Sequence, residues 1–572
     1  MPSKFQKLSK LALLVALIIF YLLPTESYLT PRSKAKGQVK DGCTKLAKNI
    51  LSSPSYDNVK ACIKGFKYDA KRAKQMIDIA EAVFLDFYSL ADQANEIPKN
   101  GSNFKPTDFK PIDLKKELNS LRDKKFKSDF EFMTTLRNLI ADSRDLGVRF
   151  NQALASLTKR FDKWLIAEGT NQFAYRFDLP ETSNISYTLL CSGKKRNLVR
   201  NWDINFLGDT DFDDSKSYFK KNCLYNSFQS AKNTSLEMNY NQTTASHSNN
   251  KTTKYQLEPV LDAKNTSLET NSNQTTTPQS NNQTTKSQLE PVVDTKDAHF
   301  YLVGDIGVAQ ITSVDFGFDA LRDIRLGFRT LFKKKAKKLV IDLSNNPGGA
   351  IDAAQVISFL LIPPNNFSFF PRDMKITNIS EPLVGPGSFF DPDELSPFPS
   401  GGNFSSIENF IGKNFVKIGN KTLRYSNKFD YKLTRNQLKV IENNKEYPWT
   451  RNNTIILTNG YCGSACALIS QYLAEIGQFP TVAVGGLYNT SLSFASFTGG
   501  EFFSYDGSVK LKDIPSLPVS GELQFTASKS YSILEKNEVL DFSYRPSKYR
   551  LYYDDKSARD PSLLWSKAAD FL

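Results

Sequence analysis

The feature of this sequence that most constrains its fold is a short apolar run that leads into a turn of small residues around a serine. Thr454–Thr458 reads TIILT, which is typical of a buried strand, and Asn459–Gly460 is a turn signal. A helical pattern of apolar side chains begins at Ala465. Ser464 is therefore expected at a helix N-terminus, where unpaired N–H groups and the helix dipole favour developing negative charge. This geometry can expose a nucleophile, and an ordinary Gly/Ser turn between a strand and a helix is the simpler alternative.

Strands and helices alternate along the chain on both sides of this turn. Further strands are predicted at 300–303, 306–311, 339–343 and 481–484, and helices at 318–332 and 350–361. Such alternation is typical of an α/β crossover sheet with helices on its faces, and active sites of such sheets lie beyond the carboxyl ends of the strands. Gly348–Gly349, in the turn NNPGG, and Ser464 both follow predicted strands, so both fall at such ends.

The first part of the chain has a different pattern. Residues 41–94 carry apolar side chains at helical spacing, and Ser128 opens a second amphipathic helix that is expected to end near Asp145. A mixed region continues to about residue 230. We therefore predict an N-terminal domain that is mainly helical.

A duplicated polar segment separates the two halves. Lys232–Ala263 is repeated as Lys264–Thr295 with a period of 32 residues, and His247 in the first copy is replaced by Gln279 in the second. Two copies this polar cannot bury a core, so we interpret them as a disordered insertion in which His247 is a solvated side chain. The predicted domains are a signal segment at 1–28, a helical domain at 29–230, an Asn/Thr-rich insertion at 231–296 and an α/β domain at 297–572.

The N-terminus has the pattern of a secretory signal. Three lysines precede the apolar run Leu11–Leu23, which is shorter than the ~20 residues of a spanning helix. We therefore expect a secreted protein, with an uncleaved signal anchor, and hence contact with a membrane, as the alternative. An even number of cysteines agrees with an oxidising compartment. Pairing by proximity joins Cys43 with Cys62, Cys191 with Cys223, and Cys462 with Cys466.

Glycosylation sequons are abundant, so the chain is expected to be a glycoprotein. The acceptor asparagines are Asn100, Asn184, Asn233, Asn241, Asn250, Asn265, Asn273, Asn282, Asn366, Asn378, Asn403, Asn420, Asn452 and Asn489.

Composition excludes several other classes of protein. The net charge is +14, but the basic runs are short and no zinc-finger or ribonucleoprotein pattern accompanies them, so we expect no nucleic-acid partner. Two histidines and disulfide-prone cysteines give no metal-ligand cluster, and no phosphate-binding glycine loop is present. We therefore expect neither a metal nor a cofactor.

The motifs LVIDLSNNPGG and NGYCGSACAL together resemble those of the tail-specific, or carboxy-terminal-processing, serine peptidase family. Within it, the sequence is similar to the eukaryotic secreted branch, which is itself similar to the chlamydial protease-like activity factor. This branch carries cysteines on both sides of the serine. Glu538–Tyr553 resembles the C-terminal pattern of this branch, and Ser128–Phe150 resembles its N-terminal helical domain. The resemblance implies a ClpP/crotonase-like crossover core and peptide-bond hydrolysis, with polypeptides as substrates.

By this resemblance Ser464 matches the nucleophile. The backbone N–H of Ala465, with one from Gly348 or Gly349, would form the oxyanion hole. Removing one such donor costs roughly 10²–10³ in turnover, which gives a glycine turn opposite the serine a physical reason.

The proton-transferring residues depart from the family pattern. Gly147 stands where this branch has a histidine base, and Gly485–Ser491 lacks the lysine that the other branch uses. Glu522 and Glu538 are candidates for the third member, although one alignment places Lys529 at that position. His299, in the quartet DAHF, resembles the base motif but lies after the insertion, and a strand-edge residue is the alternative.

Three hypotheses follow for the function. The chain is an active serine endopeptidase with an unusual base, a pseudopeptidase that binds peptides or partner proteins, or a glycosylated surface protein in which the peptidase fold is only a scaffold. An unassisted serine is a weak nucleophile, and loss of a general base costs roughly 10²–10⁴ in rate.

Overall fold

The structure of this chain is a computed structural model. It describes residues 42–48, 55–92, 112–141, 149–152, 157–160, 182–191, 194–201, 203–206, 211–223, 289–364, 369–418, 420–442, 447–486 and 489–572, the last without 490, 506–510, 512, 520, 536, 543–544, 555 and 559. The predicted signal segment, Gly147 and most of the insertion lie outside these residues. In the part of the chain that is described, no helix has the length and apolar character needed to cross a membrane.

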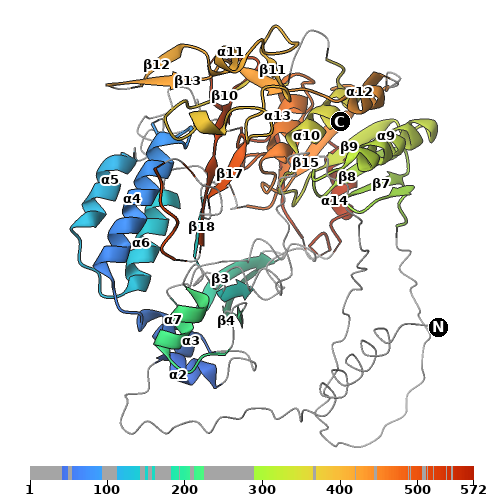
Figure 1. The fold of residues 1–572 in the computed structure, drawn as a ribbon. Coiled ribbons are helices and arrows are strands. Elements are labelled where there is room, and N and C mark those ends of the chain that lie inside the picture. The colour runs from blue at the N-terminus through green and yellow to red at the C-terminus, as the bar shows by residue number, and fades with distance from the viewer. Residues whose placement is uncertain are drawn as a thin grey trace, which may run out of the picture. The chain divides into compact units, whose positions relative to one another are not determined.

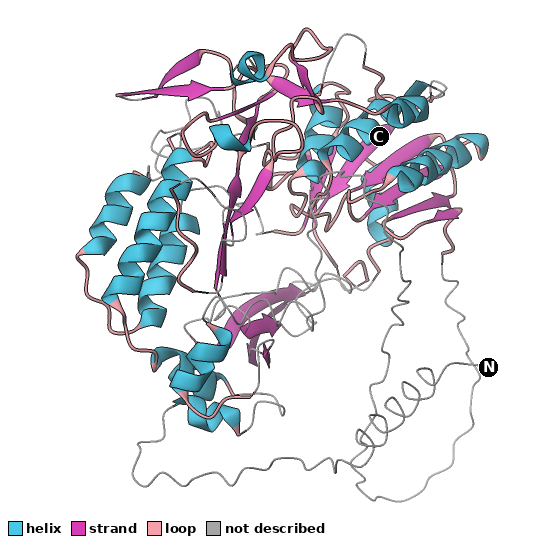
Figure 2. Ribbon diagram, in the orientation of Figure 1, coloured by secondary structure: helices cyan, strands magenta, loops and turns pink. Residues whose placement is uncertain are grey.

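The N-terminal region is built on helices, as the apolar spacing predicts. They are α2 (Gly42–Ala47), α3 (Tyr56–Lys64), α4 (Ala70–Asp86), α5 (Leu114–Arg122), α6 (Asp129–Ala141) and α7 (Ser215–Asn222). Helices α4, α5 and α6 stand side by side (Figures 1 and 2). Ser128 begins α6 as its motif predicts, because its Oγ accepts the N–H of Glu131 at 3.2 Å.

The N-terminal region also contains short strands, and the first of them, β1, pairs with a strand of the C-terminal half. They are β1 (Arg149–Gln152), β2 (Leu157–Arg160), β3 (Asn184–Cys191), β4 (Lys194–Asn201) and β5 (Asp203–Phe206). β1 pairs antiparallel with β18 (Gly521–Thr526), which in turn pairs with β17 (Phe502–Tyr505). Helices α4–α6 also share one apolar core with residues of the C-terminal half, such as Phe503 and Phe525.

The C-terminal half contains the expected crossover sheet, so the α/β fold class is confirmed. Its strand order is β20-β16-β15-β9-β8-β7-β6, and β20, β16, β15, β9 and β8 run parallel. The strands are β6 (Val293–Asp294), β7 (Ala298–Val303), β8 (Ile306–Ile311), β9 (Lys338–Asp342), β15 (Thr454–Thr458), β16 (Thr481–Val484) and β20 (Tyr549–Leu551).

Helices cover both faces of this sheet (Figure 1). One apolar core joins it to α9 (Phe318–Lys333), α10 (Ile351–Leu361), α12 (Arg435–Glu442) and α13 (Ala465–Glu475), and the other joins it to α14 (Leu563–Ala569). Side chains alternate between the two cores, with Ile341 in the first and Val340 in the second. Parallel strands that are buried on both faces read as continuous apolar runs, which is why these strands could be predicted.

A second sheet is formed by strands that lie between those of the crossover sheet in the sequence. It contains β11 (Leu395–Pro397), β14 (Phe429–Tyr431), β10 (Arg372–Met374) and β19 (Ser528–Ser530), in that order. The segment between β10 and β14 also holds α11 (Ile407–Ile411) and the hairpin of β12 (Asn414–Ile418) and β13 (Lys421–Tyr425).

Two expectations from the sequence are wrong. The insertion was expected to be disordered to residue 296, yet the last residues of its second copy form β6, because Val292 and Val293 pack against the core of the sheet. The predicted Cys191–Cys223 disulfide is not formed. Cys223 is a free, fully buried thiol in a small core beneath α7, and burial raises the pKa of this thiol. The other two predicted pairs, Cys43–Cys62 and Cys462–Cys466, are disulfides.

Candidate active site

Ser464 lies at a strained turn between β15 and α13. Its backbone has φ +52° and ψ −126°, a conformation that side-chain-bearing residues rarely adopt. Two hydrogen bonds hold it: the Ser464 N–H donates to the carbonyl of Phe497 at 2.6 Å, and the Ser464 carbonyl accepts the N–H of Leu468 at 3.1 Å. Strain of this kind costs about 1–3 kcal/mol and concentrates at functional sites.

A disulfide encloses the serine. Cys462 and Cys466 are both fully buried, and their bond closes a ring of five residues around Ser464. Cys462 also forms a β-bridge with Asn346 in the neighbouring turn. The disulfide therefore fixes the serine turn to its own helix, and the bridge fixes it to the turn after β9.

The turn after β9 is joined to the serine turn by asparagine side chains. Asn459 donates from Nδ2 to Oδ1 of Asn345 at 2.6 Å and accepts the Asn345 N–H at 3.1 Å. The carbonyl of the buried Asn346 accepts the Gly463 N–H at 3.1 Å, and its Nδ2 donates to the carbonyl of Ile311 on β8. The two turns at the carboxyl ends of β9 and β15 thus form one rigid unit.

Only glycine fits at the two positions of the NNPGG turn. A Cβ at Gly348 (φ +104°) would lie 2.5 Å from the Gly463 carbonyl oxygen and 2.7 Å from the Ser464 Cβ. One at Gly349 (φ +150°) would lie 2.3 Å from the carbonyl carbon of Val314. Backbone of this turn therefore lies directly against the serine.

The geometry distinguishes between the two glycines as oxyanion donors. The Gly348 N–H already donates to the Asn346 side chain at 2.8 Å. The N–H groups of Gly349 and Ala465 donate to no acceptor among the described residues. Ala465 with Gly349, rather than Gly348, is therefore the pair that can serve an oxyanion.

A third segment, Phe497–Gly499, forms the other wall of the site. A Cβ at Gly499 would lie 4.0 Å from Ser464 Oγ, and a Cβ at Gly463 would lie 2.6 Å from the Phe497 ring. Oδ1 of Asp541 accepts the Gly499 N–H at 2.7 Å and so fixes this segment. Sequence reasoning missed Asp541, because a single carboxylate in a C-terminal loop has no local pattern.

The structure does not bring His299 to Ser464. His299 lies on β7, and its Nδ1 is hydrogen-bonded to Asp294 on β6. Strands β8 and β9 separate β7 from β15, so three strand spacings of about 4.8 Å place the two strands roughly 14 Å apart. The strand-edge interpretation describes this residue.

Lys529 is also directed elsewhere. Its Nζ pairs with Asp373 at 3.0 Å and lies 3.1 Å from the centre of the Tyr425 ring, and burial lowers the pKa of this lysine to about 8. Its neighbour Ser530 donates from Oγ to the Gly499 carbonyl at 3.3 Å. Because successive side chains of a strand point to opposite faces, Lys529 points away from the Gly499 side of β19.

The remaining candidates supply no base within the described region. Glu538 pairs with Arg545 at 2.7 Å, which also binds Glu475 at 3.0 Å. Glu522 pairs with Asn151 through its backbone, and its side chain lies outside the described part. Gly147, the expected histidine position, lies outside it as well.

Glu501 is a further group that sequence reasoning missed. It follows Gly499–Gly500, and its backbone N–H donates to Ser528 Oγ at 2.8 Å. Burial raises the pKa of Glu501 to about 8. The buried Arg372 opposes this shift, and two nearby carboxylates add to it. The two carboxylates are Glu394 and Asp352.

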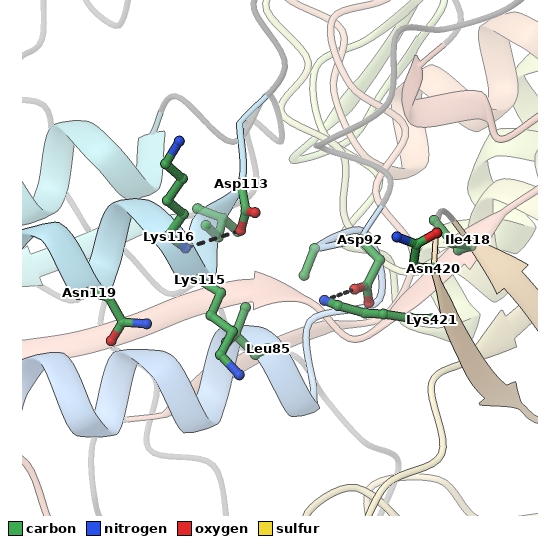
Figure 3. A pocket seen from close by; sticks show the side chains of 11 residues that line it. Leu85, Asp92, Asp113, Lys115, Lys116, Asn119, Ile418, Asn420 and Lys421 are labelled. Atoms are coloured by element: carbon green, nitrogen blue, oxygen red, sulfur yellow. Dashed lines mark hydrogen bonds and ion pairs between the residues drawn. The ribbon is translucent and has the colours of Figure 1, made fainter.

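A cavity of about 520 Å³ lies away from the serine, between α4, α5 and the β12–β13 hairpin (Figure 3). Asp92 accepts from Lys375 at 2.5 Å and from Lys421 at 2.9 Å there, and Asp113 caps α5. These pairs brace the helices against the hairpin, and we assign no chemistry to this cavity. Among the described residues, no group of three or more His, Cys, Asp or Glu side chains could hold a metal ion.

The strained serine at the end of β15 faces a glycine turn at the end of β9, which is the arrangement that the two sequence motifs predict. Residues 305–482, which contain both turns, match the model of Peptidase family S41. Over these residues the chain is therefore similar to this family, the tail-specific serine peptidases.

Comparison with solved structures found distant similarities. Mature CPAF complexed with lactacystin is 11% identical, with a TM-score of 0.44 over 88% of this chain and 98% of that one. A putative peptidase from Parabacteroides merdae is 10% identical, with a TM-score of 0.34 over 86% and 94%. The photosystem II D1 C-terminal processing protease is 10% identical, with a TM-score of 0.30 over 85% and 94%. Comparison with proteins of curated function found no match.

Proposed function

We propose that this member of the tail-specific peptidase family binds polypeptides at the Ser464 turn and hydrolyses them slowly or not at all. The observation that carries the proposal is a contrast between the groups that could bind a peptide carbonyl and the groups that could take a proton from the serine. The strained serine and the available N–H groups of Ala465 and Gly349 are suited to hold a peptide carbonyl. The two candidate bases, His299 and Lys529, are paired with carboxylates elsewhere.

A binding assay with matched glycine variants tests this proposal. Labelled, unfolded casein is titrated into wild-type protein, Ser464→Ala, Gly349→Ala and Gly304→Ala, and binding and cleavage are read in parallel. Gly304 (φ +61°) is the control, because alanine there strains the backbone but meets nothing within 4 Å. We expect binding by wild type, Ser464→Ala and Gly304→Ala. Folded Gly349→Ala should bind about 10-fold more weakly, because its Cβ displaces the turn and so moves the Gly349 N–H away from the peptide carbonyl.

The active endopeptidase is the second candidate, because strain at Ser464 is what a working nucleophile would also show. Cleavage of casein, or labelling by a fluorophosphonate, that disappears in Ser464→Ala would establish it in place of the binding protein. Absence of both binding and cleavage would favour the third candidate, a glycosylated surface protein on a peptidase scaffold.

We also propose that the chain enters the secretory pathway and carries glycans. The basic start, the apolar run and the two disulfides support this. Five of the described acceptor asparagines are exposed, namely Asn378, Asn403, Asn420, Asn452 and Asn489, whereas Asn184 is half-buried. In secretory cells, the full chain should appear with a mobility that peptide-N-glycosidase shifts, and deletion of 11–23 should leave it inside the cell without that shift. Identical mobility with and without the enzyme would contradict the glycans, and a cell-retained full chain would contradict secretion.

A further inference from the structure

The edge strand of the crossover sheet belongs to the duplicated insertion. β6 consists of Val293 and Asp294, which are residues of the second copy of the repeat. It pairs antiparallel with β7 and lies beside α9. The repeat unit therefore ends in a piece of the folded domain, and the first copy ends in nearly the same residues.

The contacts of β6 and its flanking residues depend on a few side chains and on backbone hydrogen bonds to β7. The Val292 N–H donates to the Phe300 carbonyl at 2.6 Å, and Val292 and Val293 pack against the core of the sheet. Asp294 is hydrogen-bonded to Nδ1 of His299. Thr295 closes the turn to β7 from its hydroxyl, which accepts the Ala298 N–H at 2.9 Å.

The first copy carries these features at an offset of 32 residues. Gln256–Ala263 reads QLEPVLDA, and Gln288–Thr295 reads QLEPVVDT. Val260 corresponds to Val292 and Asp262 to Asp294, so the core-facing valine and the partner of His299 are present in both copies. The two differences are Leu261, which keeps an apolar side chain, and Ala263, which lacks the hydroxyl of Thr295.

We propose that the edge of β7 that β6 covers is a docking site for this motif, and that Gln256–Ala263 is a second strand able to occupy it. In the full chain the second copy holds the site, because only 295–297 separate it from β7, whereas 263–297 separate the first copy. Closing a loop of about 35 residues instead of about 3 disfavours the first copy by roughly 40-fold. When the second copy is removed, the first copy directly precedes β7 and takes the place of the second copy.

This arrangement gives the duplication a physical consequence. Each repeat brings its own edge strand, so one copy can be lost or gained without opening the sheet. The edge of β7 is then covered in every case, and an uncovered edge is a surface on which other chains can add strands.

Three deletions in the full chain test the proposal: 232–263, 264–295, and 232–295. Thermal unfolding and hydrogen exchange with mass spectrometry are the measurements. We expect the two single deletions to unfold at the wild-type temperature, and the double deletion to unfold several degrees lower. In wild type, exchange should be slow at 288–295 and fast at 256–263. In the 264–295 deletion, the segment 256–263 should become slow.

A proline at the donor position provides the matched control. Val260→Pro removes the N–H that corresponds to that of Val292. We expect it to leave the unfolding temperature of the full chain unchanged. In the 264–295 deletion it should lower the unfolding temperature to that of the 232–295 deletion, and Val292→Pro should have this effect in the 232–263 deletion. Fast exchange at 256–263 in the 264–295 deletion, or an unfolding temperature equal to that of the double deletion, would overturn the proposal.

Discussion

A serine with a positive φ persists only when its surroundings compensate for the strain. At Ser464, the Phe497 carbonyl, the Cys462–Cys466 disulfide and the close backbone of Gly348 hold the turn. These same contacts keep the serine against the turn that carries the Gly349 N–H. The serine turn is thus firmly held, whereas His299 and Lys529, the two candidate bases that the structure describes, are paired elsewhere.

The strain at Ser464 has a measurable size. Replacement by glycine, which tolerates this backbone conformation, should relieve it. We expect Ser464→Gly to raise the free energy of unfolding by about 1 kcal/mol relative to Ser464→Ala, which keeps a Cβ. Urea unfolding of both variants measures the difference. Equal stability of the two variants would show that the turn is relaxed.

Glu501 gives the protein a pH-dependent stability. Its pKa rises from 4.5 to about 8 on folding, so the folded state binds the proton more tightly. The free energy of unfolding therefore falls as the pH rises through this range. We expect Glu501→Gln to be more stable than wild type at pH 8 by about 2 kcal/mol, a figure reduced for the partial exposure of Glu501, and similar at pH 4.

Urea titrations at the two pH values measure this difference. Glu442→Gln is the control, because Glu442 is exposed and is not among the groups that shift the pKa of Glu501. Equal stability of wild type and Glu501→Gln at pH 8 would contradict a raised pKa for Glu501.

At the scale of elements, a buried hydrogen bond adds to the apolar core that joins α14 to the sheet. Trp565 donates from Nε1 to Oδ2 of Asp342 at 2.8 Å, and both side chains are buried at the end of β9. Burial raises the pKa of Asp342, while this hydrogen bond opposes the shift. The carboxylate lies in the strand that leads to the NNPGG turn, so the C-terminal helix supports the site from behind.

Removing this donor should cost more than removing a similar one elsewhere. We expect Trp565→Phe to lower the free energy of unfolding by about 2 kcal/mol, because it leaves a buried carboxylate oxygen without its donor. Trp449→Phe is the control. Its Nε1 donates at 3.1 Å to the neutral Ala336 carbonyl, so about 1 kcal/mol is expected. Chemical denaturation distinguishes them, and equal losses would mean that the charge of Asp342 plays no part.

At the scale of the whole molecule, what the sequence could predict follows from how local each signal is. The runs 339–343 and 454–458 are buried on both faces, and turns of Gly, Asn and Pro follow them, so strands β9 and β15 and the two turns could be predicted. β6 is only two residues long in a polar repeat, so its apolar pattern is too short to detect. Cys223 failed as a disulfide partner because nearness in sequence does not determine which sulfurs meet. Asp541 and Glu501 reach the site only through the tertiary fold.

Contacts between the N-terminal region and the C-terminal half determine whether a base placed at position 147 could reach Ser464. Gly147 stands at the position where the resemblance places the base, and β1 begins two residues later at Arg149. Arg149 pairs with Gln524 of β18, close to Thr526 and the adjoining β19, whose Ser530 contacts Gly499 beside the serine. A segment of the N-terminal region is therefore held by the sheet that leads to the active site.

We expect Gly147→His to increase casein hydrolysis at least about 10-fold, a cautious part of the roughly 10²–10⁴ that a general base contributes. The increase should appear above about pH 6.5, where an imidazole is neutral and can accept a proton. Gly147→Gln, which adds a side chain of similar size without a base, should leave the rate unchanged. Adding Ser464→Ala should abolish the gain, and a gain that survives this second substitution would show that the new histidine acts elsewhere.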